Sequence, residues 1–355
     1  MRRGFYGWDE TELPLPALEA RKLRLQGAMR ADNFDALLLY TNIARPAAVS
    51  WLTGFTPYWS EGLLLVPREG DCEFITALSN RVAEWMRAVT PTGSILCTPQ
   101  PAKHFGERLA QAGAKRLGVL ELDMLSGGLA SALLAAAPGL QLVDATQCYS
   151  AARAVRDDAE RSLFARAGEI AQSSFAAIAG RETAAPFEAM GALEKAARDQ
   201  RAEEVFVTLA PDLGASANFV RVDRAPVIGA SFALRASVAY KSAWVRRTRS
   251  FSIDPRCRDL FARLDESFEA CVGSLDAGSP IATQISAAFA AHSGARLAHW
   301  SIEGCRASYP LEFLAGDSEA AGAPLSLDGC VLCAELQVGN VRWLGQAPIG
   351  SQPAR

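Results

Sequence analysis

The stretch RDDAERSLFARAGEIAQSSFAAI, residues 156–178, decides how the chain is divided. Its apolar residues recur at the spacing of one helix face, and its acidic residues cluster at the beginning, where the helix macrodipole favours negative charge. We therefore predict one long amphipathic helix from Arg156 to Ile178. Because the sequence pattern differs on its two sides, this helix is expected to join two domains.

Upstream of this helix, residues 17–145 alternate between helical and strand patterns. Short apolar runs at 35–40, 62–66, 72–77 and 116–122 are typical of strands, and charged amphipathic segments lie between them. Helices and strands in this order predict an α/β sheet domain.

Downstream, the pattern becomes that of an α+β domain with an antiparallel sheet. We predict helices at 186–199, 258–275 and 280–292, strands between 205 and 251, and strand and loop from about 296 onward. A length of 355 residues also favours two domains. The expected domains are 1–150, α/β, and 151–355, α+β.

The amino-acid composition and charge bear on which partners the protein could bind. Half of the residues are hydrophobic and 21% are charged, with a net charge of −3, so bulk electrostatics favour neither nucleic acid nor an anionic membrane as partner. The first residues lack the apolar core of a signal peptide, and the chain has no apolar run of membrane-spanning length. We expect a cytoplasmic protein. The close pair Cys330 and Cys333 lies in an apolar strand pattern, which favours buried core thiols over a redox site.

Five segments, in order along nearly the whole chain, carry a resemblance. They are Leu52-Thr-Gly-Phe55 with the following Leu-Leu-Leu-Val-Pro67, the joining helix with Glu160, Tyr240–Phe251, Leu275-Asp-Ala-Gly-Ser-Pro280 and Val331-Leu-Cys-Ala-Glu335. Together they resemble the creatinase/aminopeptidase P/prolidase family. The resemblance implies an RNase-H-like creatinase N-terminal domain, a pita-bread second domain holding the site, and a homodimer. It also implies two divalent ions held by two aspartates, one histidine and two glutamates.

The positions that this resemblance assigns to the two aspartates hold Arg235 and Arg246. A guanidinium carries a fixed positive charge and offers no lone pair to a metal ion. A divalent ion about 5 Å from one guanidinium would be repelled by about 7 kcal/mol at an effective dielectric of about 20. We therefore predict no bound metal and no other cofactor.

The remaining positions keep little of the implied ligand set. The histidine falls at Trp300, or at His299 if the alignment slips by one residue; the first glutamate is kept as Glu335, and the second falls at Leu344. The histidine that serves as proton shuttle in metal-free creatinases falls at Asn218. No double CxxC…CxxC motif or HExxH pattern replaces the missing ligands.

Two interpretations of the arginines remain open. If Arg235 and Arg246 face each other on paired strands, their repulsion is relieved either by a bound anion or by an internal salt bridge with Glu335. His299 is either structural or an acid/base residue oriented by Glu303 or Glu335. Trp300 either stacks on a substrate or fills the space that metal ions would occupy.

Two hypotheses of function follow. In the first, the chain is a metal-independent protein that binds a small carboxylate-bearing or peptide-like ligand and hydrolyses a C–N bond, amide or amidino. Its catalytic residues would be Glu335 and His299, and its substrate-binding residues Arg235, Arg246, Asn218 and Trp300. In the second, it is a pseudoenzyme that acts as a scaffold, or as a heterodimer partner of an active homologue.

Overall fold

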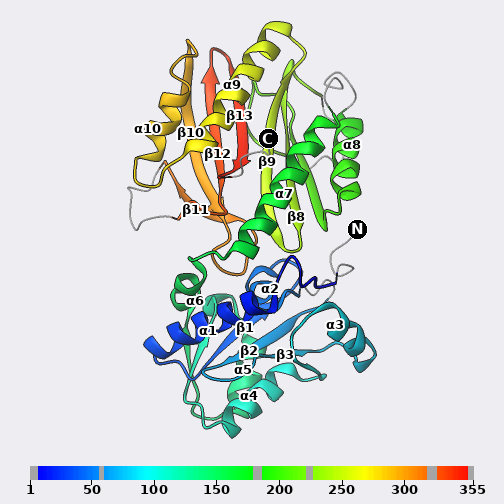
Figure 1. The fold of residues 1–355 in the computed structure, drawn as a ribbon, viewed down its shortest axis with the longest axis vertical. Helices are drawn as coiled ribbons and strands as arrows, with labels where there is room; N and C mark the ends of the chain where they lie inside the picture. The colour runs from blue at the N-terminus through cyan, green and yellow to red at the C-terminus, as the bar shows by residue number, and fades with distance from the viewer. Residues whose placement is uncertain (1–6, 56–59, 179–185, 221–226, 318–325, 351–355) are drawn as a thin grey trace. The chain divides into compact units, whose positions relative to one another are not determined.

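A computed structural model of the chain describes residues 7–55, 60–178, 186–220, 227–317 and 326–350. The chain divides into two compact units, one made of Arg2–Glu160 with Cys305–Pro310 and the other of Arg161–Gly304 with Leu311–Arg355. Each unit has its own β-sheet (Figure 1). Among the described residues, no helix has both the length and the apolar character that crossing a membrane requires.

The N-terminal unit is built on a six-stranded mixed sheet in the order β4-β3-β2-β1-β5-β6. β1 pairs antiparallel with β2 and parallel with β5. The strands are β1 (Ala36–Thr41), β2 (Gly62–Pro67), β3 (Glu73–Thr76), β4 (Ser94–Cys97), β5 (Arg116–Val119) and β6 (Gln141–Asp144). The helices are α1 (Leu15–Ala31), α2 (Ala47–Thr53), α3 (Ala83–Val89), α4 (Pro101–Gln111), α5 (Gly127–Ala136) and α6 (Thr146–Arg153).

Alternation along β1 explains how this sheet is covered on both sides. Leu37 and Leu39 belong to one apolar core, whereas Ala36 and Leu38 belong to the other. Helix α2 ends at Thr53 because the next residue, Gly54, adopts φ +63°, a left-handed conformation that glycine tolerates best.

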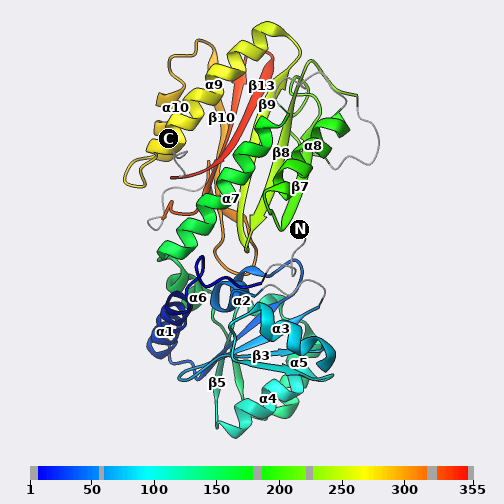
Figure 2. The ribbon, with the colours of Figure 1, turned by 45° about the vertical axis from the view of Figure 1, so that its right-hand side comes forward.

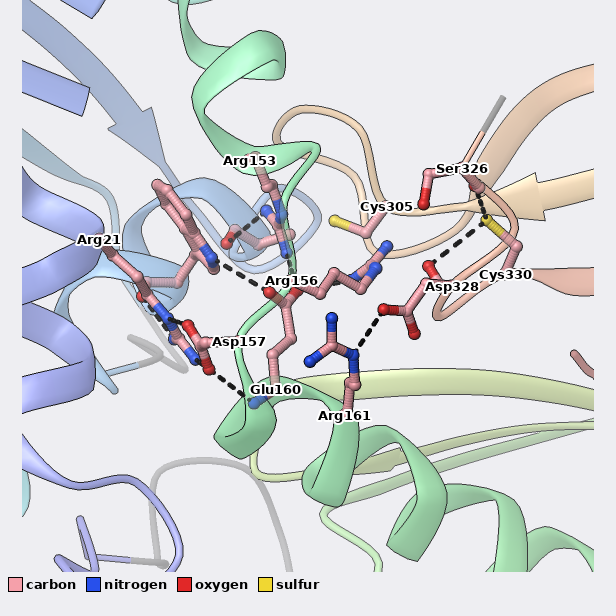
Figure 3. Close-up of polar contacts among 12 residues, drawn as sticks. Arg21, Arg153, Arg156, Asp157, Glu160, Arg161, Cys305, Ser326, Asp328 and Cys330 are labelled. Atoms are coloured by element: carbon pink, nitrogen blue, oxygen red, sulfur yellow. Dashed lines mark hydrogen bonds and ion pairs between the residues drawn. The ribbon is translucent and has the colours of Figure 1, made fainter. Parts of the chain in front are cut away.

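Buried charges in this unit are paired within it (Figure 3). Arg156 Nη1 lies 2.5 Å from Glu160 Oε1, and Trp51 Nε1 donates to Glu160 Oε2 at 3.3 Å. Arg21 holds Asp157 through two hydrogen bonds of 2.6 and 2.8 Å. Glu160 therefore has a structural role in this unit.

The second unit is built on a seven-stranded sheet in the order β11-β10-β12-β13-β9-β8-β7, whose pairings are all antiparallel. The strands are β7 (Glu204–Ala210), β8 (Ser231–Tyr240), β9 (Ala243–Ser252), β10 (Ala295–Gly304), β11 (Glu312–Gly316), β12 (Val331–Val338) and β13 (Val341–Pro348). The helices are α7 (Asp158–Ala176), α8 (Pro186–Asp199), α9 (Pro255–Ser274) and α10 (Ile281–Ala288).

These helices lie on one side of the seven-stranded sheet, as the two views agree (Figures 1 and 2). Contacts of β9 with α9 identify the covered face: Arg247 Nη1 lies 2.6 Å from a Glu269 oxygen, and Arg249 Nη2 lies 2.9 Å from an Asp265 oxygen. Since side chains alternate along a strand, Arg235 and Arg246 point to the opposite face. We call this opposite face the polar face.

Candidate functional site

A linked group of side chains crosses the polar face, and we call it the central polar cluster. Its members come from β8, β9, β10, β12 and β13, so residues up to about a hundred positions apart meet there. They are Arg235, Ser237, Arg246, Thr248, Ser301, Glu303, Cys333 and Gln346.

Arg246 is the arginine of the cluster that forms an ion pair within the protein. Its Nη1 lies 2.5 Å from Glu303 Oε2, and its Nε donates to Ser237 Oγ at 3.1 Å. The Arg246 and Glu303 side chains are only 22% and 18% exposed. Arg246 therefore has its compensating carboxylate within the protein.

Neutral groups fill the middle of the cluster. Thr248 Oγ1 donates to Gln346 Oε1 at 2.7 Å, and Gln346 Nε2 donates to Cys333 Sγ at 3.0 Å. Burial raises the pKa of the Cys333 thiol to about 12, so the thiol is protonated at neutral pH. Cys333 is thus a buried hydrogen-bonding thiol. Both cysteines of the CxxC stretch are buried, as predicted.

Arg235 is the cation that the cluster does not neutralise. Its guanidinium carbon lies 3.6 Å from the centre of the Phe219 ring. Within the described part of the chain, Arg235 Nε has no hydrogen-bond partner, and the same is true of Oγ1 of Thr208, the residue opposite it on β7. Burial, and then the charge of Arg246, lowers the pKa of Arg235 to about 10. Two buried polar atoms on paired residues therefore both lack a hydrogen-bond partner among the described residues.

The register of β8 and β9 corrects one expectation. Arg235 lies opposite Thr248, and Arg246 lies opposite Ser237, so the arginines are diagonal neighbours on the same face. The shift arises at the turn, where Lys241 and Ser242 both adopt positive φ, 44° and 67°, and make a two-residue hairpin loop. Directly facing arginines would require the turn to be centred on residues 240–241. Diagonal neighbours lie about 7–8 Å apart, compared with about 5 Å for facing ones.

Glu335 has a different partner from the one expected. One of its oxygens lies 3.2 Å from Arg342 Nε, whereas Arg246 pairs with Glu303. On the neighbouring strands Glu335 lies opposite His299 and Leu344. The internal salt bridge between Glu335 and the arginines of β8 and β9 is therefore not the one that forms.

His299 and Trp300 are consecutive residues of β10, so their side chains lie on opposite faces of the sheet. His299 Nδ1 contacts the Asp317 carboxylate, and the His299 side chain is 54% exposed. Asp317, and neither of the expected glutamates, therefore orients the ring. Trp300 lies opposite Ala334 and packs with the core that contains α9 and α10, which places it away from Arg235. Asn218 is exposed, and its backbone N–H donates to Ser216 Oγ at 3.0 Å.

Sequence reasoning missed Thr208 and Phe219 entirely, and it considered Glu303 only as a partner for His299. Alternation along β10 offered one signal for Glu303, because Ser301 and Glu303 share a face. No signal in the sequence sets Thr208 opposite Arg235, since that pairing depends on where β7 begins to pair with β8.

The donor chemistry of the site does not fit a pair of divalent ions. Arg235, Arg246 and Leu344 supply no anionic oxygen or neutral nitrogen to an ion. Nowhere in the described ranges do three or more His, Cys, Asp and Glu side chains gather so that they could hold a metal ion.

Comparison with known proteins identifies the N-terminal domain. Residues 21–155 match the family model of the creatinase/prolidase N-terminal domain. This segment is a creatinase/prolidase N-terminal domain. No curated protein sequence matches the chain significantly. The creatinase/prolidase resemblance of the sequence is thereby confirmed for the N-terminal domain.

Solved structures extend the likeness to the second unit. The Xaa-Pro dipeptidase from Bacillus anthracis has a TM-score of 0.67 at 16% identity, covering 95% of this chain and 99% of that one. A prolidase from Pyrococcus horikoshii gives 0.69 at 16% identity, covering 94% and 96%. The X-Pro aminopeptidase from Thermotoga maritima gives 0.70 at 15% identity, covering 93% and 99%. The creatinase/prolidase-like chain thus has the expected fold class, a creatinase N-terminal domain followed by a pita-bread domain.

Proposed function

We propose that this creatinase/prolidase-like chain is a metal-independent protein that binds a small carboxylate-bearing compound at Arg235. The observation that carries the proposal is the half-buried Arg235, whose buried Nε lacks a hydrogen-bond partner in the described residues, as does the Thr208 hydroxyl on the neighbouring strand. A carboxylate accepts hydrogen bonds from both groups and supplies the missing negative charge.

The charge balance of the cluster favours an anion over a cation. Arg235 and Arg246 are two fixed positive charges, and among the described residues the carboxylate of Glu303 pairs with Arg246 and also acts on Arg235. A metal ion entering this site would add further positive charge, whereas a carboxylate neutralises the surplus. The family's metal ions therefore have no place in the proposal.

A second candidate activity, hydrolysis of a C–N bond, is favoured by the pairing of His299 with Asp317. A carboxylate on Nδ1 fixes the ring and leaves Nε2 as the proton acceptor, which is the arrangement of a general base. Glu335 lies opposite His299 on β12 and would act as the second acid/base group only after release from Arg342. In this scheme His299 and Glu335 are catalytic, and Arg235 anchors the substrate carboxylate.

The pseudoenzyme alternative is favoured by the ion pairs that already exist. Arg246 is held by Glu303 and Glu335 is held by Arg342, so two of the charged groups considered for chemistry have structural partners. A scaffold, or a partner of an active homologue, needs no further group from this face.

Binding is tested by titrating acetate and propionate into the full chain with a chelator present, and following backbone amide shifts or heat. We expect saturable binding to the wild type and at least a tenfold loss for Arg235→Met, since the charged anchor is removed. The matched control is Arg263→Met, at an exposed arginine on α9. Equal binding by wild type and Arg235→Met would contradict the proposal.

Hydrolysis is tested separately with small amides and guanidino acids. Turnover that survives chelation and is lost in His299→Asn supports the enzyme. Carboxylate binding without turnover by any substrate leaves the binding proposal standing and supports the pseudoenzyme.

A further inference from the structure

A stacked aromatic pair lies next to the two arginines on the polar face. The rings of Phe206 and Trp244 stack with centroids 5.8 Å apart and an interplanar angle of 8°. Phe206 is on β7 and Trp244 is on β9, so the pair spans the intervening strand β8. Phe206 nevertheless remains 55% exposed.

Small side chains on β8 explain why the rings meet. Phe206 lies opposite Ser237, and Trp244 lies opposite Ala239. Strands two apart in a sheet are about 9–10 Å from each other, so two rings can stack only by leaning over a central strand that carries small residues. Ser237 and Ala239 are 8% and 1% exposed. The stacked pair therefore lies above them and leaves much of Phe206 exposed, and we call this apolar surface the platform.

The platform lies near Arg235 on the polar face, and Arg235 Nε has no hydrogen-bond partner in the described residues. Thr208 lies opposite Arg235, and Phe206 is two residues away from Thr208 on the same face. Likewise, Trp244 is two residues from Arg246. Phe206 and Arg235 are thus diagonal neighbours on adjacent strands, about 7–8 Å apart. A compound whose carboxylate contacts Arg235 therefore has its neighbouring atoms within reach of the rings.

We infer that the ligand carries a planar apolar group a few bonds from its carboxylate, with Phe206 and Trp244 as the residues that select it. This inference rests on the proposed binding of a carboxylate at Arg235. A flat ring laid on the platform covers the exposed part of Phe206 while its carboxylate neutralises Arg235. A compound with only one of these features satisfies only one half of the site.

Three probes separate the two halves of the site: 3-phenylpropionate, propionate and 3-phenylpropionamide. Each is titrated into the full chain, with binding followed by heat and by tryptophan fluorescence. For the wild type we expect 3-phenylpropionate to bind about three- to tenfold more tightly than propionate, the gain typical of an aromatic contact. The neutral amide is expected to bind at least tenfold more weakly than 3-phenylpropionate.

Phe206→Ser is expected to abolish the preference for the aromatic acid while leaving the affinity for propionate unchanged. Phe206 is exposed on an edge strand, so this change is not expected to unfold the sheet. Phe313→Ser is the matched control, because Phe313 is 54% exposed and lies on β11, the strand at the other edge of the same sheet. Phe313→Ser should keep the full preference.

The outcomes distinguish carboxylate binding at Arg235 from selection of an aromatic group by Phe206 and Trp244. Equal affinity for propionate and 3-phenylpropionate, both lost in Arg235→Met, overturns the aromatic selection and leaves the carboxylate site standing. Failure of both acids to bind overturns the carboxylate site and the selection with it. A preference that persists in Phe206→Ser places the aromatic group elsewhere and also overturns the inference.

Discussion

Replacing Arg235 by methionine is expected to stabilise the ligand-free protein, which is unusual for a buried side chain. The pKa of Arg235 falls from 12.5 to about 10, with burial as the main cause and Arg246 as the second. At about 1.4 kcal/mol per pKa unit, the charged side chain costs the folded state about 3 kcal/mol. Methionine has a similar length and no charge, so it removes most of this cost and keeps a contact with Phe219.

The sign of the pH dependence follows from the same shift. Because the folded protein holds this proton less tightly than the unfolded chain, the cost is fully present below pH 10 or so and is relieved as the pH rises through that value. The stability difference between Arg235→Met and the wild type should therefore be constant from about pH 6 to about pH 9.

Arg246→Met provides the opposing comparison on the same face. Its loss breaks the 2.5 Å ion pair with Glu303 and the hydrogen bond to Ser237, so we expect destabilisation by about 2 kcal/mol. The assay is urea denaturation in a chloride buffer free of carboxylates and phosphate, followed by fluorescence and circular dichroism. If Arg235→Met proves less stable than the wild type by more than about 1 kcal/mol, the guanidinium has an internal partner and the reasoning is refuted.

Three further predictions concern the same unit. Glu303→Gln is expected to lower stability by about 2–3 kcal/mol in urea denaturation, because it leaves the Arg246 guanidinium without its paired carboxylate. Asp199→Asn is the control: it breaks an ion pair with Lys195 that is also 2.5 Å long, but whose side chains are 75% (Lys195) and 62% (Asp199) exposed. This change should alter stability by no more than about 0.5 kcal/mol. If Glu303→Gln and Asp199→Asn have equal effects, the polar cluster does not stabilise the protein as proposed. Gly345→Ala is expected to cost about 1–3 kcal/mol, because the added Cβ would lie 2.2 Å from an atom of the Trp343 ring, and an unchanged urea midpoint would show that the ring moves freely. Prolonged chelation should leave the melting temperature unchanged, and a stoichiometric transition metal in elemental analysis of the purified protein would contradict the metal-independent proposal.

Local sequence signals located the four α-helices described in the second unit. The predicted helix at 156–178 corresponds to α7, Asp158–Ala176, and the prediction for α8 matches Pro186–Asp199. Such segments are recognisable because amphipathic periodicity and terminal charges act within a few turns of the chain. The fold class was likewise predictable from the order of these segments, and the structural relatives agree with it.

Partner choice in the polar cluster was predictable only in part. The sequence indicated that Arg235 and Arg246 share a face near Glu335, and alternation along the hairpin made this reasonable. The two-residue turn moved the register, and Glu303, 57 positions from Arg246 in the chain, took the place expected for Glu335. Salt-bridge partners across a sheet depend on turn geometry and strand order, which no short segment encodes by itself.

By itself, the sequence determined the charges available at these positions: fixed guanidinium charges at 235 and 246 and a carboxylate at 335. The tertiary structure alone decided which of these charges are neutralised. In the folded chain Arg246 pairs with Glu303, and Glu335 pairs with Arg342. Arg235 lies beside Thr208 and Phe219. The physical reason is that charge is a property of one residue, whereas its compensation depends on which distant strands are brought within a few ångströms of it.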